Sequence, residues 1–180
     1  MKTQTLQIDR LLTERLILIP FTIQICKSIL QDDFNDLFKM GLKKGLSWPD
    51  DDVKETLPKI INNLSKVESP TGFESWMIIK SDTLEIIGDL GFKGFNYEQE
   101  NADIGYGIIK EERRKGYAEE AVTGLLKWAF MKESVKEITA NCLAENTSSV
   151  NLLRKFNFIE LRTENEMIYW KLGNKNFKRK

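Results

Sequence analysis

A short basic stretch, Lys110–Ala118, holds the residues of this sequence that are best suited to chemistry. It reads Lys-Glu-Glu-Arg-Arg-Lys-Gly-Tyr-Ala and lies between an apolar segment and a segment of helical periodicity. The first amides of a helix have no partner within it, and the helix dipole adds positive potential there. Gly116 lets the main chain approach a ligand closely, because it has no Cβ atom. The stretch therefore predicts a diphosphate-type anion site, although an ordinary solvated helix start has the same composition.

The residue types that are missing narrow the chemistry further. The sequence contains no histidine, which excludes nucleophilic sites built on histidine and histidine-rich zinc sites. A general base must then be Asp, Glu, Tyr, Lys, Cys or a chain of waters. Of the two cysteines, Cys142 could carry an acyl group, but without a histidine to activate it an inert thiol is the preferred interpretation. Two cysteines are too few for a disulfide framework and suit a reducing compartment.

Charge and hydropathy limit the partners. Lys plus Arg and Asp plus Glu number 27 each, so net charge favours neither a nucleic-acid nor a membrane partner. Residues 174–180 predict a basic C-terminal tail, which leaves an RNA- or ribosome-associated module as one alternative. No apolar run approaches the roughly 20 residues that span a bilayer. The N-terminal residues show no signal-peptide pattern. We therefore expect a cytoplasmic protein.

The elements that must position the basic stretch form a single mixed α+β domain over residues 1–180. The clearest is a helix over 118–130, where apolar residues recur at steps of three and one. Three consecutive antiparallel strands are predicted before it, and the remaining pattern predicts two helices near the N-terminus and one after Asn146. The glycines at 41 and 45 make the first helix irregular, and Pro58 is a cost or a break in the second. The predicted strands are 15–20, 75–80, 85–92, 102–109, 135–143, 158–161 and 167–172, and the other predicted helices are 22–44, 50–66 and the one that Asn146 begins.

Several motifs in this order resemble the GNAT superfamily of N-acetyltransferases. Arg113-x-x-Gly116-x-Ala118 is similar to the acetyl-CoA-binding motif Gln/Arg-x-x-Gly-x-Gly/Ala of that family. Thr13-Glu-Arg-Leu-Ile-Leu18 resembles the first strand of its RimJ/RimL-like branch, which acetylates ribosomal-protein N-termini and other amines. Asn146-x-x-Ser149 followed by Leu153-Arg-Lys-Phe-Asn-Phe158 resembles a later segment of that branch, with Asn157 where the family usually has glycine. The segment from about Phe34 to Gly72, where substrate-selecting helices would lie, matches no motif.

The resemblance implies a fold and a cofactor site. The fold would be a central, mostly antiparallel sheet of about seven strands flanked by about four helices. Acetyl-CoA would be the acyl donor, with no metal. The strand before the basic loop would diverge from its neighbour and offer main-chain groups to the pantetheine arm. The residues expected to bind acetyl-CoA are Ile108, Ile109, Arg113, Arg114, Lys115, Gly116, Tyr117, Ala118, Asn146 and Ser149.

The catalytic roles implied by the resemblance fall on two residues. Asp103 stands where some GNAT members carry a catalytic glutamate, and a carboxylate is needed because an acceptor amine is mostly protonated at neutral pH. Glu74, Glu85 and Asp89 are alternatives on neighbouring strands. Ser149 would protonate the leaving thiolate, since the helix after Asn146 has no tyrosine. Helix capping explains Asn146 and Ser149 equally simply.

The expected function is acetyl transfer to a primary amine, directly within a ternary complex. The acceptor is a protein N-terminus or a small-molecule amine, and the residues do not choose between them. The resemblance includes ribosomal proteins among the expected partners. A non-catalytic acyl-CoA-binding sensor is the alternative, because the base is not unique and the usual tyrosine is missing. The branch includes dimers, so a homodimer is a further expectation of the resemblance.

Overall fold

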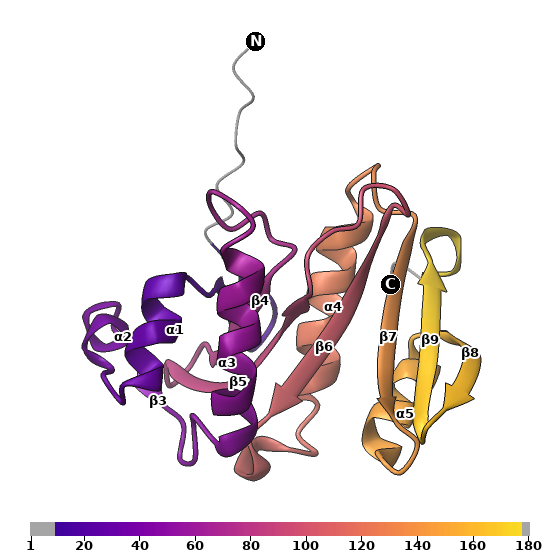
Figure 1. Ribbon diagram of the computed structural model, residues 1–180. Coiled ribbons are helices and arrows are strands. Elements are labelled where there is room, and N and C mark those ends of the chain that lie inside the picture. Colours follow the sequence, from indigo (N-terminus) through magenta and orange to yellow (C-terminus); the bar gives the residue numbers. More distant parts are fainter. Residues whose placement is uncertain (1–9, 178–180) are drawn as a thin grey trace.

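The computed structural model describes residues 10–177, in which a twisted mixed sheet carries helices on both faces (Figure 1). The strands are β1 (Leu11–Leu12), β2 (Leu16–Pro20), β3 (Lys43–Lys44), β4 (Ser75–Lys80), β5 (Glu85–Phe92), β6 (Asn101–Ile108), β7 (Glu137–Leu143), β8 (Ile159–Glu164) and β9 (Met167–Gly173). The α-helices are α1 (Ile23–Leu30), α2 (Asn35–Lys39), α3 (Asp51–Leu64), α4 (Tyr117–Phe130) and α5 (Thr147–Lys155). The α+β prediction is confirmed. The described residues add two strands of two residues each, β1 and β3, and divide the first predicted helix into α1 and α2.

The order of the strands confirms a mostly antiparallel sheet. Its path is β1-β2-β4-β5-β6-β7-β9-β8, with β3 pairing beside β5. The three strands β4, β5 and β6 are consecutive and antiparallel, as the sequence predicts. The β6–β7 pair is parallel, and its register extends only from Asn101 opposite Glu137 to Ile104 opposite Ala140. Figure 1 shows the two strands side by side where they begin and diverging toward their C-terminal ends.

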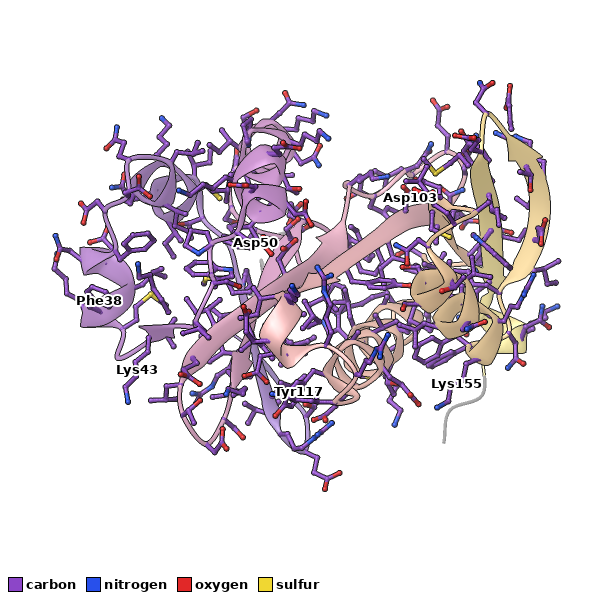
Figure 2. All side chains as sticks on the ribbon, turned by 90° about the horizontal axis from the view of Figure 1, so that it is seen from below. Phe38, Lys43, Asp50, Asp103, Tyr117 and Lys155 are labelled. Atoms are coloured by element: carbon purple, nitrogen blue, oxygen red, sulfur yellow. The ribbon has the colours of Figure 1, made fainter. Side chains whose placement is uncertain are left out.

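Helices cover both faces of the sheet. Figure 2, seen from below, shows α3 on one side of β6 and α4 on the other. The predicted apolar stripe of α4 is buried against the sheet, with Ala121, Val122, Leu125 and Leu126 at 0% exposure. α5 lies on the α4 side, where Lys155 Nζ pairs with Glu119 Oε2 at 2.7 Å. One face of the sheet thus carries α1 and α3, and the opposite face carries α4 and α5.

The first residues of α3 follow the predicted pattern, and Pro58 does not break the helix. Asp50 caps α3 by accepting a hydrogen bond from Val53 N at 3.0 Å. Pro58 removes one helical donor, the amide that would bond Lys54. Because Pro58 is exposed, water can serve the carbonyl of Lys54. The helix therefore continues to Leu64 and presents one full side to the sheet.

The first residues of the predicted basic tail lie in the described part of the chain. Asn174 begins a 3-10 turn, and its side-chain Nδ2 donates to Phe130 O at 3.4 Å and to Val135 O at 3.3 Å. The Phe177 ring is buried with its centroid 5.2 Å from that of Phe130. Residues 174–177 therefore pack on the domain, and the rest of the predicted tail, 178–180, lies outside the described residues.

Asn157 ends α5 in a left-handed conformation with φ of 64°. Its amide bonds Arg154 O at 3.0 Å, and the following amide of Phe158 bonds Leu153 O at 3.0 Å. Asparagine is the residue that most readily replaces glycine in such a position, so the asparagine keeps the same chain reversal. No helix among residues 10–177 has the length and hydropathy needed to cross a membrane.

Candidate active site

The divergence of β6 and β7 leaves main-chain groups of β6 without a strand partner. Backbone groups of a strand point alternately to its two neighbours. The Ile109 amide donates to Ile87 O at 2.9 Å, so odd-numbered residues at this end of β6 face β5. The main-chain groups of Tyr106 and Ile108 therefore face the gap, where the ladder to β7 has already ended at Ile104. Of the two isoleucines predicted to pair with a cofactor arm, Ile108 faces the gap, and the amide of Ile109 is occupied within the sheet.

The basic loop closes the wide end of this gap. Gly116 adopts φ of 83°, a left-handed conformation that favours glycine, and stands directly before α4. The first helical bond joins Glu120 N to Gly116 O at 3.0 Å, and no side chain caps the helix. The amides of residues 117–119 are therefore without partners inside the helix. This is the geometry that the sequence predicts for an anion site.

One acidic side chain of the loop, Glu112, is neutralised by two lysines. Glu112 bonds Lys115 Nζ at 2.8 Å and Lys80 Nζ at 3.1 Å. These contacts lower the pKa of Glu112, with the hydrogen bond from Lys115 as the largest cause. Arg114, with φ of 62°, makes no ion pair among the described residues, whereas Arg113 Nε donates to Ile108 O at 2.8 Å. Arg114 is thus a cation of the loop that remains available to an anion.

Arg15 anchors the loop to the rest of the domain, a role that its sequence context does not predict. Its Nε pairs with Glu120 Oε2 at 2.7 Å, and its Nη1 donates to Lys115 O at 3.0 Å. Its guanidinium also lies 4.5 Å from the ring centroid of Tyr117. One side chain therefore joins the start of β2, the loop and the first turn of α4. It also compensates the Glu120 carboxylate, which would otherwise oppose an anion there.

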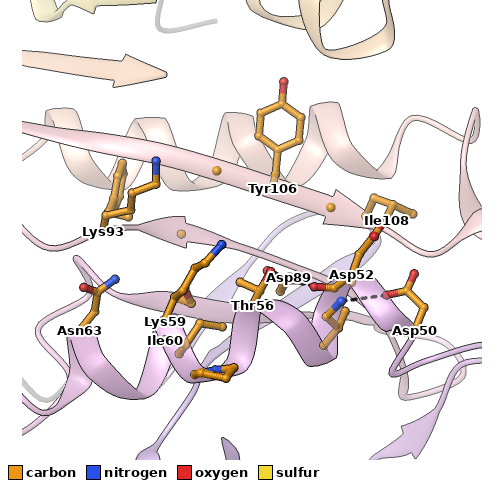
Figure 3. Close-up of a pocket in the computed structure, with 18 of the residues that line it drawn as sticks. Asp50, Asp52, Thr56, Lys59, Ile60, Asn63, Asp89, Lys93, Tyr106 and Ile108 are labelled. Carbon is orange, nitrogen blue, oxygen red and sulfur yellow. Dashed lines mark hydrogen bonds between the residues drawn. The ribbon is translucent and has the colours of Figure 1, made fainter. Parts of the chain in front are cut away.

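On the α4 side, Tyr106 and Ser149 lie close together across the gap. Figure 3 shows the Tyr106 ring pointing away from α3. Burial raises the pKa of Tyr106, and a contact with the Ser149 hydroxyl partly opposes that rise. The Tyr106 hydroxyl is nevertheless buried without a hydrogen bond of normal geometry. Asn146 Oδ1 accepts from Ser149 N at 3.1 Å, so helix capping is observed for Asn146.

On the α3 side, a cleft of about 690 Å³ lies between α3 and the strands β5 and β6. Figure 3 shows Asp50, Asp52 and Thr56 of α3 facing these strands. Gly105 and Gly107 of β6 line the cleft, and a Cβ atom added at either would meet nothing within 4 Å. The segment 34–72, which matched no motif, thus supplies one wall of the cleft through α3. The opposite wall leaves space because its glycines have no side chains.

Asp89 lies at the floor of this cleft, on β5 directly opposite Gly107. The residue is partly exposed, yet its carboxyl group lies deep among protein atoms, as is expected at the bottom of a narrow cleft. Burial, together with the negative charges of Asp50 and Asp52, raises the pKa of Asp89 to about 7. No hydrogen bond or ion pair of its carboxylate is found among the described residues. A carboxylate with these properties can accept a proton near neutral pH.

The other candidate carboxylates are already engaged. Asp103 accepts hydrogen bonds from Thr139 Oγ1 at 3.0 Å and Asn141 Nδ2 at 3.2 Å, and pairs with Lys93. Figure 2 shows it toward the far end of β6 from Tyr117. Glu74 is buried and accepts from both the amide and the hydroxyl of Thr71. The hydrogen bond from Lys80 lowers the pKa of Glu85.

The predicted residues therefore separate into two groups. Ile108, Arg114, Gly116, Tyr117, Ala118, Asn146 and Ser149 border the gap or the start of α4, whereas Asp103 lies apart from the cleft floor. Tyr106 was missed, although the alternation of residues along β6 places it on the same face as Ile108. Cys142 lies on β7 beside Tyr106, and Cys26 is buried, which raises the pKa of its thiol to about 12.

The chain is similar in sequence to known proteins. The family model described as "Acetyltransferase (GNAT) domain" matches residues 15–159. The protein named "Uncharacterized N-acetyltransferase YjdG" of Bacillus subtilis (strain 168) is 35% identical over 158 residues, which cover 88% of this chain and 94% of that relative.

Two solved structures share the fold. One is described as "RimL- Ribosomal L7/L12 alpha-N-protein acetyltransferase in complex with Coenzyme A", with a TM-score of 0.65 and 14% identity over 91% of this chain and 97% of that chain. The other is a spermidine N-acetyltransferase chimera "from Vibrio cholerae and hSSAT", with a TM-score of 0.64 and 15% identity over 93% of this chain and 100% of that chain. At these identities the similarity concerns the fold.

Proposed function

The chain belongs to the GNAT acetyltransferase family and is an acyl-CoA-dependent acetyltransferase, and on that premise we propose that it acetylates a primary amine by direct transfer in a ternary complex. The observation that carries the proposal is the gap between β6 and β7, which has an anion-type loop at one end and a cleft on one face. A donor held in the gap and an acceptor held in the cleft would meet across β6. Holding both reactants in this way supplies much of the rate of a bimolecular transfer.

The residues around the gap fit coenzyme A. The unpartnered amides at the start of α4 and the guanidinium of Arg114 suit a diphosphate. Gly116 keeps the approach open, because the nearest atom to an added Cβ is Arg15 Nη2 at 3.3 Å. The main-chain groups of Tyr106 and the amide of Ile108 suit the amides of a pantetheine arm, whereas the Ile108 carbonyl already accepts from Arg113 Nε. Asn146 Nδ2 is also available, since only its Oδ1 serves the helix cap.

The leaving thiolate would lie on the α4 side of the gap, where Ser149 and Tyr106 place their hydroxyl groups. A buried hydroxyl without a hydrogen-bond partner is costly unless it serves a ligand. We propose that Tyr106 and Ser149 together deliver a proton toward sulfur, the role that Ser149 alone was predicted to have. Asn146 orients Ser149 through the helix cap.

The acceptor is proposed to be a protein N-terminus or a small-molecule amine. The names of the two structural neighbours cover both classes, one with a ribosomal protein and one with spermidine. The cleft on the α3 side is open at its surface and large enough for an extended aliphatic amine. This supports the small-molecule class without removing the other.

The test is release of free thiol from acetyl-CoA with a panel of amines and N-terminal peptides, together with coenzyme A binding by calorimetry. We expect wild-type protein to bind coenzyme A and to release thiol only with an amine present. Gly116→Asp should abolish binding, because it adds a negative charge at the loop. Gly116→Ala is the matched control, since it carries the same left-handed strain without the charge.

Two results would contradict the proposal. Wild-type coenzyme A affinity of Gly116→Asp would remove the cofactor from this loop. Tight binding of acetyl-CoA with no turnover of any amine or peptide would instead favour the non-catalytic sensor.

A further inference from the structure

We propose that Asp89 accepts the proton of the acceptor, and that the acceptor enters the cleft as a cationic primary amine. The inference rests on the proposed transfer to an amine and goes beyond it in naming the base and the charge state of the substrate. Asp89 takes the place of Asp103, the base that the family resemblance implies.

The register of the sheet directs Asp89 toward the reaction. Directly opposed residues of antiparallel strands project from the same face, so Asp89 and Gly107 share the face that lines the cleft. Neither Gly107 nor Gly105 has a side chain, and the space above both is empty. No side chain of β6 at these two positions therefore separates the Asp89 carboxylate from the gap beyond.

The surroundings of Asp89 are negative, which favours an arriving cation. Asp50 and Asp52 face it from α3, and Cys26 lies near it from α1 as an uncharged thiol. Neither Asp52 nor Asp89 has a basic partner among the described residues, and Asp50 only caps its own helix. An ammonium group in the cleft would compensate charges that the protein leaves uncompensated.

Two of the three cations that line the same cleft are engaged with other groups. Arg113 donates to Ile108 O, and Lys93 pairs with Asp103. Lys59 lies farther along α3, beyond Thr56 from Asp52 (Figure 3). The cleft therefore has a negative end at Asp89 and a more basic end at Lys59 and Lys93. An ammonium group is drawn to the end where the carboxylate has no partner.

The proton and electron balance of the step is complete. The ammonium nitrogen gives one proton to a carboxylate oxygen of Asp89, which frees its lone pair. The nitrogen then bonds the thioester carbonyl carbon, the carbon–sulfur bond breaks, and its electron pair leaves on sulfur. The second proton lost by nitrogen passes to sulfur, which departs as the thiol. Asp89 releases its proton to water through the open side of the cleft.

The decisive experiment compares Asp89→Asn with Asp103→Asn in kcat/KM against pH, using a strongly basic primary amine that the wild type turns over. We expect Asp89→Asn to lower kcat/KM about 10²- to 10⁴-fold and to keep wild-type affinity for coenzyme A. Asp103→Asn should retain the acidic limb of the wild-type profile. With a weakly basic amine that is neutral at pH 7, the loss in Asp89→Asn should shrink to less than about tenfold, because the acceptor then arrives without the extra proton.

Two further measurements separate the base from a structural role. Asp52→Asn should move the acidic limb to lower pH, because it removes one of the charges that raise the pKa of Asp89. Carboxyl titration of the free protein, followed by infrared difference spectroscopy, should show a group titrating near pH 7 that is missing in Asp89→Asn. The carboxyl titration does not depend on bound cofactor.

The outcomes distinguish this inference from the proposed function. A wild type that acetylates amines while Asp89→Asn keeps its rate and pH profile would overturn the role of Asp89 alone. Loss of the acidic limb in Asp103→Asn would assign the base to Asp103 and also overturn it. A wild type that acetylates no amine would overturn both.

Discussion

Replacing Asp89 with asparagine should make the stability of the fold less sensitive to a rise in pH from about 4 to 7. In the folded protein, burial and the nearby Asp50 and Asp52 raise the pKa of Asp89 from 3.8 to about 7. Between these values the folded state binds a proton that the unfolded state has lost, so stability falls as pH rises through this window and is level above it. One pKa unit corresponds to about 1.4 kcal/mol, which sets an upper limit of about 4 kcal/mol for the whole window.

The measurable part of this effect is smaller. Asp89 is partly exposed in the cleft, so water lowers the cost of its charge. We expect the wild type to lose about 1 to 2 kcal/mol of unfolding free energy between pH 5 and pH 8 through this one group. Asp89→Asn should lack that loss.

Urea unfolding of both proteins at several pH values from 5 to 8 provides the assay. The difference in unfolding free energy between Asp89→Asn and the wild type should grow with pH up to about 7 and then stay constant. Asp82→Asn, which changes an exposed carboxylate in the turn between β4 and β5, is the control and should follow the wild type. Parallel pH dependences of Asp89→Asn and the wild type would refute the reasoning.

Three further changes test other parts of the site. Gly107→Leu should raise KM for the amine about tenfold or more, equivalent to about 1.4 kcal/mol, because the new side chain enters empty cleft space. Its coenzyme A affinity should be unchanged, and unaltered amine kinetics would contradict this prediction. Arg15→Lys should weaken coenzyme A binding in calorimetry about tenfold, since lysine cannot contact both Glu120 and the Lys115 carbonyl; wild-type affinity would remove Arg15 from loop positioning. Tyr106→Phe should leave thermal stability unchanged or higher, because the lost hydroxyl makes no hydrogen bond. Its kcat should fall about 10²-fold, and a wild-type kcat would show that the hydroxyl serves no proton transfer.

Much of the fold could be predicted because its signals are local. The stripe of Ala121, Val122, Leu125 and Leu126 repeats with the period of a helix, and the structure buries it in α4. Predictions were less complete where a short element depends on a distant partner. β3 exists only because Lys43 and Lys44 pair beside β5, and Phe177 packs on Phe130 although the composition around it resembles a solvated tail.

The candidate site shows the same division. The loop before α4 could be predicted, because Gly116 and the start of the helix are adjacent in the chain. Arg15 could not be placed there, since it reaches the loop across 100 residues of sequence. Tyr106 and Ser149 likewise come from β6 and α5 and meet only in the folded domain.

The sequence by itself determined the mixed α+β class, the absence of histidine chemistry and the position of the basic loop before α4, because each depends on composition or on neighbouring residues. Only the tertiary structure decided which carboxylate remains without a partner. Strand pairing brings Thr139, Asn141 and Lys93 to Asp103, whereas Asp89 lies between α3 and two glycines of β6 and meets no donor. Ionisable groups are tuned by what surrounds them in space, and that arrangement comes from the register of the strands and the packing of α3.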